Sequence, residues 1–120
     1  MMRTMLKGKI HRAKITDAKI HYEGSISLDP NLMEAADILP YEMVHVLDVD
    51  NGARLETYAI PGPRGSGDVC MLGAAARLIV KGDTVIILSY HLATEEEAPK
   101  VKPKVVYVNE LNAIVSVKET

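Results

Sequence analysis

A chain of 120 residues, 48% of them hydrophobic, is long enough for one compact domain with an apolar core but short for two. A formal net charge of −2 without a long run of Lys or Arg predicts no nucleic-acid partner and no attraction to an acidic membrane surface. No apolar run approaches membrane-spanning length, and the segment 1–7 is too polar and short for a signal peptide, so we expect a cytoplasmic protein.

The cysteine and aromatic content of the chain narrows the expected class of protein further. The single cysteine, Cys70, excludes an internal disulfide, and with four scattered histidines it forms no spacing typical of zinc, so no metal is expected. Phe and Trp are absent, and a core of Ile, Val, Leu, Met and Ala favours strands. We therefore expect one mainly β domain over residues 1–120, which closes into a barrel or pairs with copies of itself to protect its edges.

The first expected strand runs from Met5 to Ile15, where apolar residues alternate loosely with basic ones. It carries Lys9 and His11, for which solvated surface is the simplest interpretation. Next come Gly24 and Ser25, a glycine before a hydroxyl nucleophile at the entry to the strand-like segment 26–28.

A Gly-Ser pair is most often a turn, but it also suits a backbone that cleaves itself. The Ser25 hydroxyl would attack the carbonyl of Gly24, the acyl group would move from nitrogen to oxygen, and elimination would break the ester and leave a ketone. In this hypothesis Gly24 contributes strained or positive-φ geometry that lets the hydroxyl reach the carbonyl.

A short helix is expected to begin with Asp29 as its cap and Pro30 in its first turn, and to end near Ile38 and Leu39. Strands 43–49 and 53–60 follow, joined by a turn at Asn51-Gly52, the strongest hairpin signal in the chain.

Alternation along the return strand of this hairpin puts Arg54, Glu56 and Tyr58 on one face and Thr57 on the other. Arg54 and Tyr58 are therefore expected to point into the same space.

The second half of the chain alternates turns with strands. Residues 61–68 form a loop without the spacing of a phosphate cradle, and residues 73–77 form a short helix or tight turn. After a turn at 81–83 we expect a buried strand over 84–90, with the continuous apolar run Val85 to Leu88. An acidic, Pro-containing surface connection over 93–104, expected to be mobile, leads to strands at 105–108 and around 114–117.

Taken together and in order, several of these segments resemble pyruvoyl-dependent aspartate decarboxylases. The likeness is close up to about Tyr90 and looser beyond it, and the matching segments are 1–12, 22–25, 51–54, 57–60, 64–67, 73–76 and 82–83. The resemblance implies a double-psi β-barrel and a homotetramer with sites between subunits. It also implies a proenzyme that cleaves itself into a β chain of residues 1–24 and an α chain of residues 25–120.

The activity implied by the resemblance is decarboxylation of L-aspartate to β-alanine for pantothenate synthesis. Ser25 would become the covalent pyruvoyl cofactor, whose ketone condenses with the substrate amine and accepts the electrons released with CO2. Lys9 and Arg54 would hold the substrate carboxylates, with the assignment of each left open. Tyr58 would return a proton to the carbon that lost CO2, although a strand tyrosine alone indicates core or interface packing.

The remaining implied roles concern processing and shape. Thr57 would hydrogen-bond the Gly24 carbonyl during cleavage, and Tyr22 with Glu23 would shape the cut site. Backbone contacts to the substrate would come from Gly73, Ala74 and Ala75, and apolar walls from Ile60 and Ile86.

One residue departs from the family pattern: Leu72 stands where the family usually has Asn before Gly-Ala-Ala-Ala. A leucine makes no side-chain hydrogen bond, so processing or turnover slows if that Asn places the cut site. The alternatives are a non-catalytic barrel module of the same fold, a decarboxylase of another acidic amino acid such as glutamate, and a hydrolase with His21 or His11 as base. Whether an accessory protein assists maturation stays open.

Overall fold

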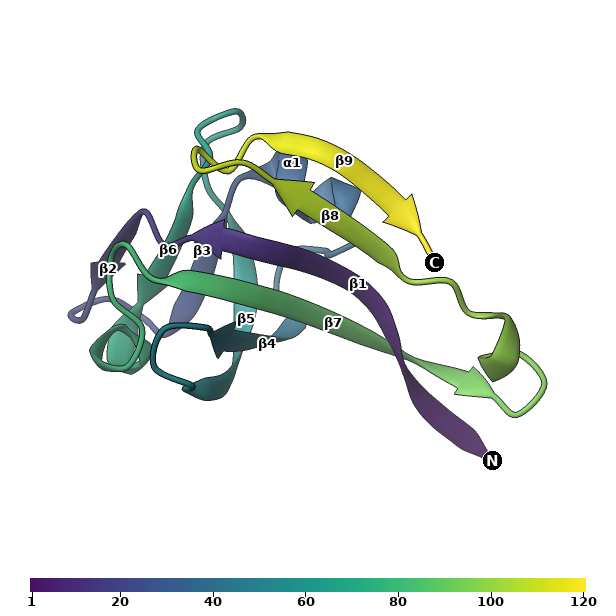
Figure 1. Cartoon of the computed structure of the whole chain (residues 1–120). Helices are drawn as coiled ribbons and strands as arrows, with labels where there is room; N and C mark the ends of the chain where they lie inside the picture. The colour runs from purple at the N-terminus through teal and green to yellow at the C-terminus, as the bar shows by residue number, and fades with distance from the viewer.

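The computed structural model describes residues 1–120 as nine strands, one α-helix and two short 3₁₀ helices (Figure 1). The strands are β1 (Met2–Lys14), β2 (Asp17–Lys19), β3 (Ser25–Leu28), β4 (Met43–Asp48), β5 (Arg54–Pro61), β6 (Val69–Leu72), β7 (Thr84–Thr94), β8 (Lys104–Val108) and β9 (Ile114–Glu119). The helices are α1 (Pro30–Ala35), η1 (Gly73–Arg77) and η2 (Ala98–Lys100), and none is long and apolar enough to cross a membrane.

All nine strands join in one sheet in the order β2-β6-β3-β5-β4-β7-β1-β8-β9. β1 pairs antiparallel with β7 and parallel with β8, and β3 pairs parallel with β5, so several neighbours in space are distant in sequence. The long strands β1 and β7 curve together across the molecule (Figure 1). The expected mainly β class is confirmed, and the sheet is compatible with the expected double-psi barrel.

The core is a cluster of 19 buried residues from most of the strands and from the helical segments α1 and η1, and it includes Ile10, Ile26 and Ile87. Strand β7 extends to Thr94, beyond its expected end. Its residues Ile86 and Leu88 are only half-buried, so the prediction of a continuously buried run was wrong: alternate side chains face opposite sides of the sheet.

Local signals placed the helix and the hairpin correctly. The Asp29 carboxylate accepts a hydrogen bond from the backbone N–H of Asn31 at 2.9 Å, as expected of an N-cap. Helix α1 ends at Ala35, earlier than predicted, and the left-handed backbone of Asp37 (φ 58°) lies just beyond it. Gly52 has φ 77° in the turn that joins the antiparallel strands β4 and β5.

Two features were not predicted. Strands β2 and β6 pair with each other, and β6 also pairs with β3, across more than forty residues of sequence in each case. The segment after β7 begins with a local tie, because the N–H groups of Thr94 and Glu97 each donate to the other residue's side chain. This segment then contains η2, where Ala98 is buried, so it packs against the rest of the chain.

Candidate functional site

Ser25 lies at the first position of β3, and its side chain is buried, with 2% of the residue exposed. Across the β3–β6 pair it faces Leu72. Its hydroxyl donates a long hydrogen bond of 3.4 Å to the carbonyl of Glu23. The nucleophile is therefore held at the entry of a strand, with its hydroxyl turned back toward the segment that precedes it.

The conformation around Gly24 differs from the prediction. Gly24 is not among the residues with positive φ, and a Cβ built on it would meet no atom within 4 Å. The special glycine is Gly73, with φ 82°, whose Cβ would lie 2.6 Å from the Cα and 2.8 Å from the N of Gly24. The positive φ that was one form of the predicted Gly24 geometry is therefore absent, and the close approach to Gly24 that demands glycine occurs at the start of η1.

Two hollows open on either side of the Gly24–Ser25 bond and share Tyr58. The Ser25 hollow, about 340 Å³, is lined by Tyr22, Glu23, Ser25, Tyr41, Tyr58, Ile60 and Leu72. The Thr57 hollow, about 500 Å³, is lined by Gly24, Leu55, Glu56, Thr57, Tyr58, Ala74, Ala75 and Leu78. Most of the predicted processing and substrate-contacting residues therefore gather around the predicted cut site.

Strand pairing explains this convergence. Parallel pairing of β3 with β5 sets Ile26 opposite Ala59, which puts Ser25 level with Tyr58. Thr57 and Tyr58 are consecutive on β5 and project to opposite faces, so only Tyr58 reaches the Ser25 hollow. The Tyr58 ring also packs against Tyr41, with centroids 6.1 Å apart, and Tyr41 is a lining residue that the sequence did not reveal.

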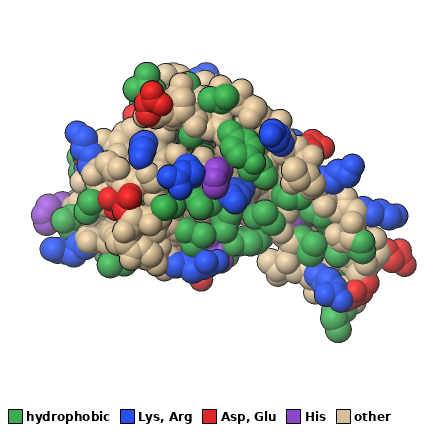
Figure 2. Space-filling view, viewed as in Figure 1, with side chains coloured by type: hydrophobic (Ala, Val, Ile, Leu, Met, Phe, Trp, Pro, Cys, Tyr) green, Lys and Arg blue, Asp and Glu red, His purple; other side chains and the backbone are tan.

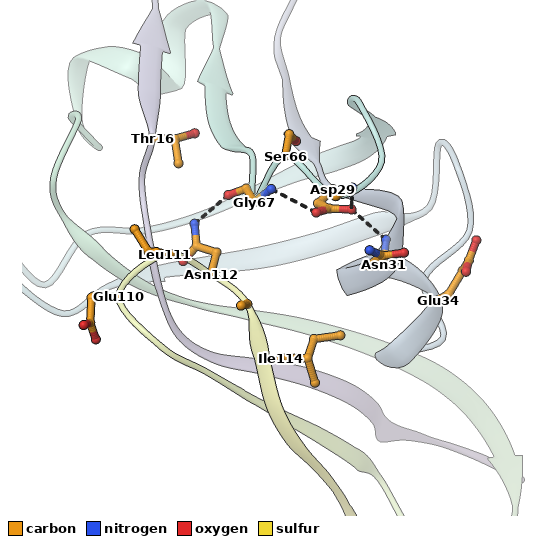
Figure 3. Close-up of a pocket in the computed structure, with 12 residues that line it drawn as sticks. Thr16, Asp29, Asn31, Glu34, Ser66, Gly67, Glu110, Leu111, Asn112 and Ile114 are labelled. Carbon is orange, nitrogen blue, oxygen red and sulfur yellow. Dashed lines mark hydrogen bonds between the residues drawn. The ribbon is translucent and has the colours of Figure 1, made fainter.

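A hollow of about 800 Å³, larger than either of these two, lies elsewhere, between α1, the loop before β6 and the turn before β9 (Figure 3). Its buried polar groups are already paired. The Asp29 carboxylate accepts from the N–H groups of Gly65 and Gly67 at 3.1 and 2.9 Å, and the Asn112 amide donates to the carbonyl of Gly67. This region therefore anchors the loop 62–68 and holds none of the predicted catalytic residues.

Neither Cys70 nor His11 is suited to act as a rival nucleophile or base at this site. Burial raises the pKa of Cys70, and the nearby Asp17 carboxylate adds to the effect, so Cys70 remains a thiol. Burial lowers the pKa of His11, as do the charges of Lys9 and Arg12, and its ring packs against Tyr107 in a different hollow from Ser25.

Comparison with known proteins decides the family. A family model described as aspartate decarboxylase matches residues 1–115. This chain belongs to the aspartate decarboxylase family. A protein of Dehalococcoides mccartyi named aspartate 1-decarboxylase is 63% identical over 114 residues, which are 95% of this chain and 92% of that protein. Proteins of the same name from Carboxydothermus hydrogenoformans and Thermoanaerobacter pseudethanolicus are 57% and 58% identical, covering 99% and 97% of this chain and 94% and 99% of theirs.

In this member of the aspartate decarboxylase family, neither predicted carboxylate anchor lines the Ser25 hollow or the Thr57 hollow. Lys9 is on β1, which is four places from β3 in the strand order of the curved sheet. Arg54 is four residues before Tyr58 on β5, roughly 13 Å along the strand, and lines a separate hollow with His45, Leu55 and Glu56. In one chain Arg54 and Tyr58 line different hollows, and their shared space and their roles stay predictions.

The departure from the family pattern lies inside the site. Leu72 lines the Ser25 hollow and faces Ser25 across the β3–β6 pair. Its side chain offers neither a donor nor an acceptor to the cut site. Of the two predicted apolar walls, Ile60 lines the same hollow, while Ile86 is half-buried on β7, opposite Leu47 of β4.

Proposed function

We propose that this chain is an aspartate 1-decarboxylase that releases CO2 from L-aspartate to form β-alanine, in the supply of pantothenate. The carrying observation is a buried serine, Ser25, set level with Tyr58 and preceded by a glycine that the backbone of Gly73 contacts closely. Membership in the aspartate decarboxylase family supports the same reaction. A non-catalytic module is not favoured, because the whole predicted residue set is present despite Leu72.

Maturation of the chain would begin with its own serine. The Ser25 oxygen attacks the Gly24 carbonyl carbon, the Gly24–Ser25 C–N bond breaks, and the acyl group passes to oxygen as an ester. Elimination then takes a proton from the Ser25 Cα and breaks its Cβ–O bond, which releases residues 1–24 with a C-terminal carboxylate. Water replaces the nitrogen of residue 25 as ammonia leaves, and a terminal ketone remains on residues 25–120.

The surroundings fit these steps. Thr57 and Gly24 line the same hollow, which supports a role for the Thr57 hydroxyl in donating to the Gly24 carbonyl oxygen as negative charge develops there. The Ser25 hydroxyl must leave its 3.4 Å contact with the Glu23 carbonyl before it attacks. That contact is long and weak, and rotation about the Ser25 Cα–Cβ bond is sufficient to break it.

The Ser25 hollow also fits a pyruvoyl group at position 25. That group supplies an electron-accepting carbonyl for the loss of CO2. Ile60 and Leu72 give this hollow two apolar walls, and a further subunit that covers its open side would exclude water and strengthen electrostatic interactions there. Tyr58 is the predicted proton donor, and it lines the Ser25 hollow; proton donation of this kind contributes roughly 10²- to 10⁴-fold.

Substrate anchoring supports an assembly with sites shared between subunits. Lys9 and Arg54 line neither hollow beside Ser25 in one chain, so a neighbouring copy is proposed to complete the site in a homotetramer. Large apolar side chains beside the Ser25 hollow are open to solvent in one chain, most of all Tyr41, which is 76% exposed. Hydrophobic side chains also gather over the middle of β1 and β7 (Figure 2).

The strongest anchor should hold the carboxylate that stays on the product, since tight ground-state binding of the departing carboxylate would oppose its loss. Arg54 suits that role through its bidentate guanidinium.

The proposal also includes a cytoplasmic location and a reaction without a metal. The free, buried Cys70 agrees with the cytoplasmic location. An accessory protein that speeds maturation is compatible with the slow chemistry expected at Leu72.

The proposal is tested by β-alanine production from L-aspartate in Ser25→Ala, with Ser27→Ala as the matched control on the same strand. We expect the first variant to remain one chain of 120 residues without activity and the second to cleave and turn over aspartate. Unchanged activity in Ser25→Ala would refute the proposal. Glutamate, one methylene longer, should be used roughly 10- to 200-fold less efficiently than aspartate.

A further inference from the structure

Three aspartates meet at one end of the sheet, and none of them lines the Ser25 hollow or the Thr57 hollow. Asp48 ends β4, Asp50 lies in the turn that follows, and Asp83 lies in the turn before β7. Antiparallel pairing of β4 with β7 sets Asp48 opposite Val85 and so brings the two turns together. Each aspartate offers one carboxylate oxygen, and these oxygens lie within 4.8 Å of one another.

The backbone fixes one oxygen of each carboxylate and leaves the other free. Asp48 Oδ1 accepts from the N–H groups of Asp50 and Asn51, at 2.8 and 3.3 Å. Asp50 Oδ2 accepts from the Thr84 N–H at 2.7 Å, and Asp83 Oδ2 accepts from the Val80 N–H at 3.3 Å. The three side chains are thereby held in place with three oxygens available to a ligand.

The free oxygen of Asp48 needs a partner. Asp48 is 3% exposed, and its Oδ2 is buried without any hydrogen-bond donor. No Lys, Arg or His forms an ion pair with any of the three aspartates. Burial raises the pKa of Asp48, and the neighbouring Asp83 carboxyl raises it further. An unpaired buried carboxylate beside two others is costly, and a cation or a shared proton would offset that cost.

We propose that Asp48, Asp50 and Asp83 bind a hard divalent cation, with Ca²⁺ the best match in size. Ca²⁺ binds carboxylate oxygens at roughly 2.3–2.6 Å, so two of its ligands lie up to roughly 5 Å apart, which accommodates the 4.8 Å limit. The partly open position of Asp50 and Asp83 leaves room for water to complete the coordination. Aspartate ligands on two turns favour Ca²⁺ or Mg²⁺ over softer metals.

The bound cation would tie the β4–β5 turn to the turn before β7. The β4–β5 turn also reaches η1, because the Asn51 amide donates to the carbonyl of Leu78 at 2.6 Å. Leu78 lines the Thr57 hollow, and Arg54 follows the same turn on β5. The expected effect is a more stable arrangement of this end of the sheet, independent of whether the chain decarboxylates aspartate.

The test is calorimetric titration of the metal-free full chain with CaCl2 and MgCl2, together with thermal melting at each concentration. We expect saturable Ca²⁺ binding and a rise in melting temperature in the wild type. Asp83→Asn and Asp50→Asn should weaken Ca²⁺ binding roughly tenfold or more, since even indirect support of a metal ligand is worth 10- to 100-fold. Asp37→Asn, with the same loss of charge outside the cluster, should bind as the wild type does.

Two results would overturn the inference. One is the absence of Ca²⁺ and Mg²⁺ binding by the wild type at millimolar concentration. A melting temperature that changes with pH would then indicate a proton shared by Asp48 and Asp83 in place of a cation. The other is an equal loss of binding in Asp37→Asn and Asp83→Asn, which would indicate nonspecific attraction to acidic surface.

Discussion

Replacing Gly73 by alanine tests whether the start of η1 positions the bond that is cleaved. A Cβ at this position would lie 2.6 Å from the Gly24 Cα, whereas ordinary contacts begin near 3.4 Å, so the two segments must separate by about 0.8 Å. A misplacement of about 1 Å typically costs a reaction roughly 10²-fold in rate. We therefore expect Gly73→Ala to slow self-cleavage by roughly 10²-fold.

The left-handed backbone of Gly73 (φ 82°) adds a separate cost to the folded chain, of roughly 1–2 kcal/mol for an L-residue. Gly65 has nearly the same φ, 80°, but a Cβ there would meet no atom within 4 Å. Gly65→Ala is thus a matched control that carries the backbone cost without the clash. It should lose similar stability and still cleave at the wild-type rate.

The assay follows the mass of freshly purified protein over time and measures the fraction of intact chain remaining. Thermal melting of both variants checks that they are folded at the assay temperature. Equal cleavage rates in Gly73→Ala and Gly65→Ala would refute the positioning argument, whatever their stabilities.

Three further predictions concern other residues. Tyr58→Phe keeps the ring against Tyr41 but removes the hydroxyl, so it should cleave normally and lose roughly 10²- to 10⁴-fold in kcat for aspartate. Leu72→Asn should speed self-cleavage by up to roughly tenfold, the equivalent of one hydrogen bond of about 1.4 kcal/mol, in the same mass assay. Asp29→Ala should lower the free energy of unfolding in urea by roughly 2–4 kcal/mol at pH 7, because three N–H groups lose their acceptor. Burial disfavours the charged form of Asp29, but the hydrogen bonds from these N–H groups outweigh burial and lower the pKa of Asp29 in the folded chain. The stability that the charged Asp29 contributes is therefore fully present above pH 3.8, and it is lost as the pH falls through the lower folded-state pKa.

The parts of the fold that depend on neighbouring residues were predictable from sequence. The Asp29 cap and the Asn51-Gly52 turn involve backbone groups a few positions away, so the residue types determine the structure. Strands β2 and β6 escaped prediction because each is short and is defined by partners far along the chain.

The candidate site, too, was predictable only in part. Family resemblance identified Ser25 and its neighbours, but the close approach of Gly73 to Gly24 depends on how β6 packs beside β3, which no local pattern reveals. The same holds for the contact of Asp48 and Asp50 with Asp83, which follows from the register of β4 against β7. Neither Lys9 nor Arg54 lines the hollows beside Ser25 in one chain, and under the proposal a neighbouring copy completes the site.

The most direct test of the central claim is chemical identification of residue 25 in the purified protein. The chain should be reduced with borohydride, and the peptide that begins at position 25 should be isolated and its mass determined before and after reduction. The account predicts fragments that separate between Gly24 and Ser25, with a reducible carbonyl in place of the serine amine on the larger one. An active protein in which residue 25 is still an intact serine within an uncut chain would contradict it.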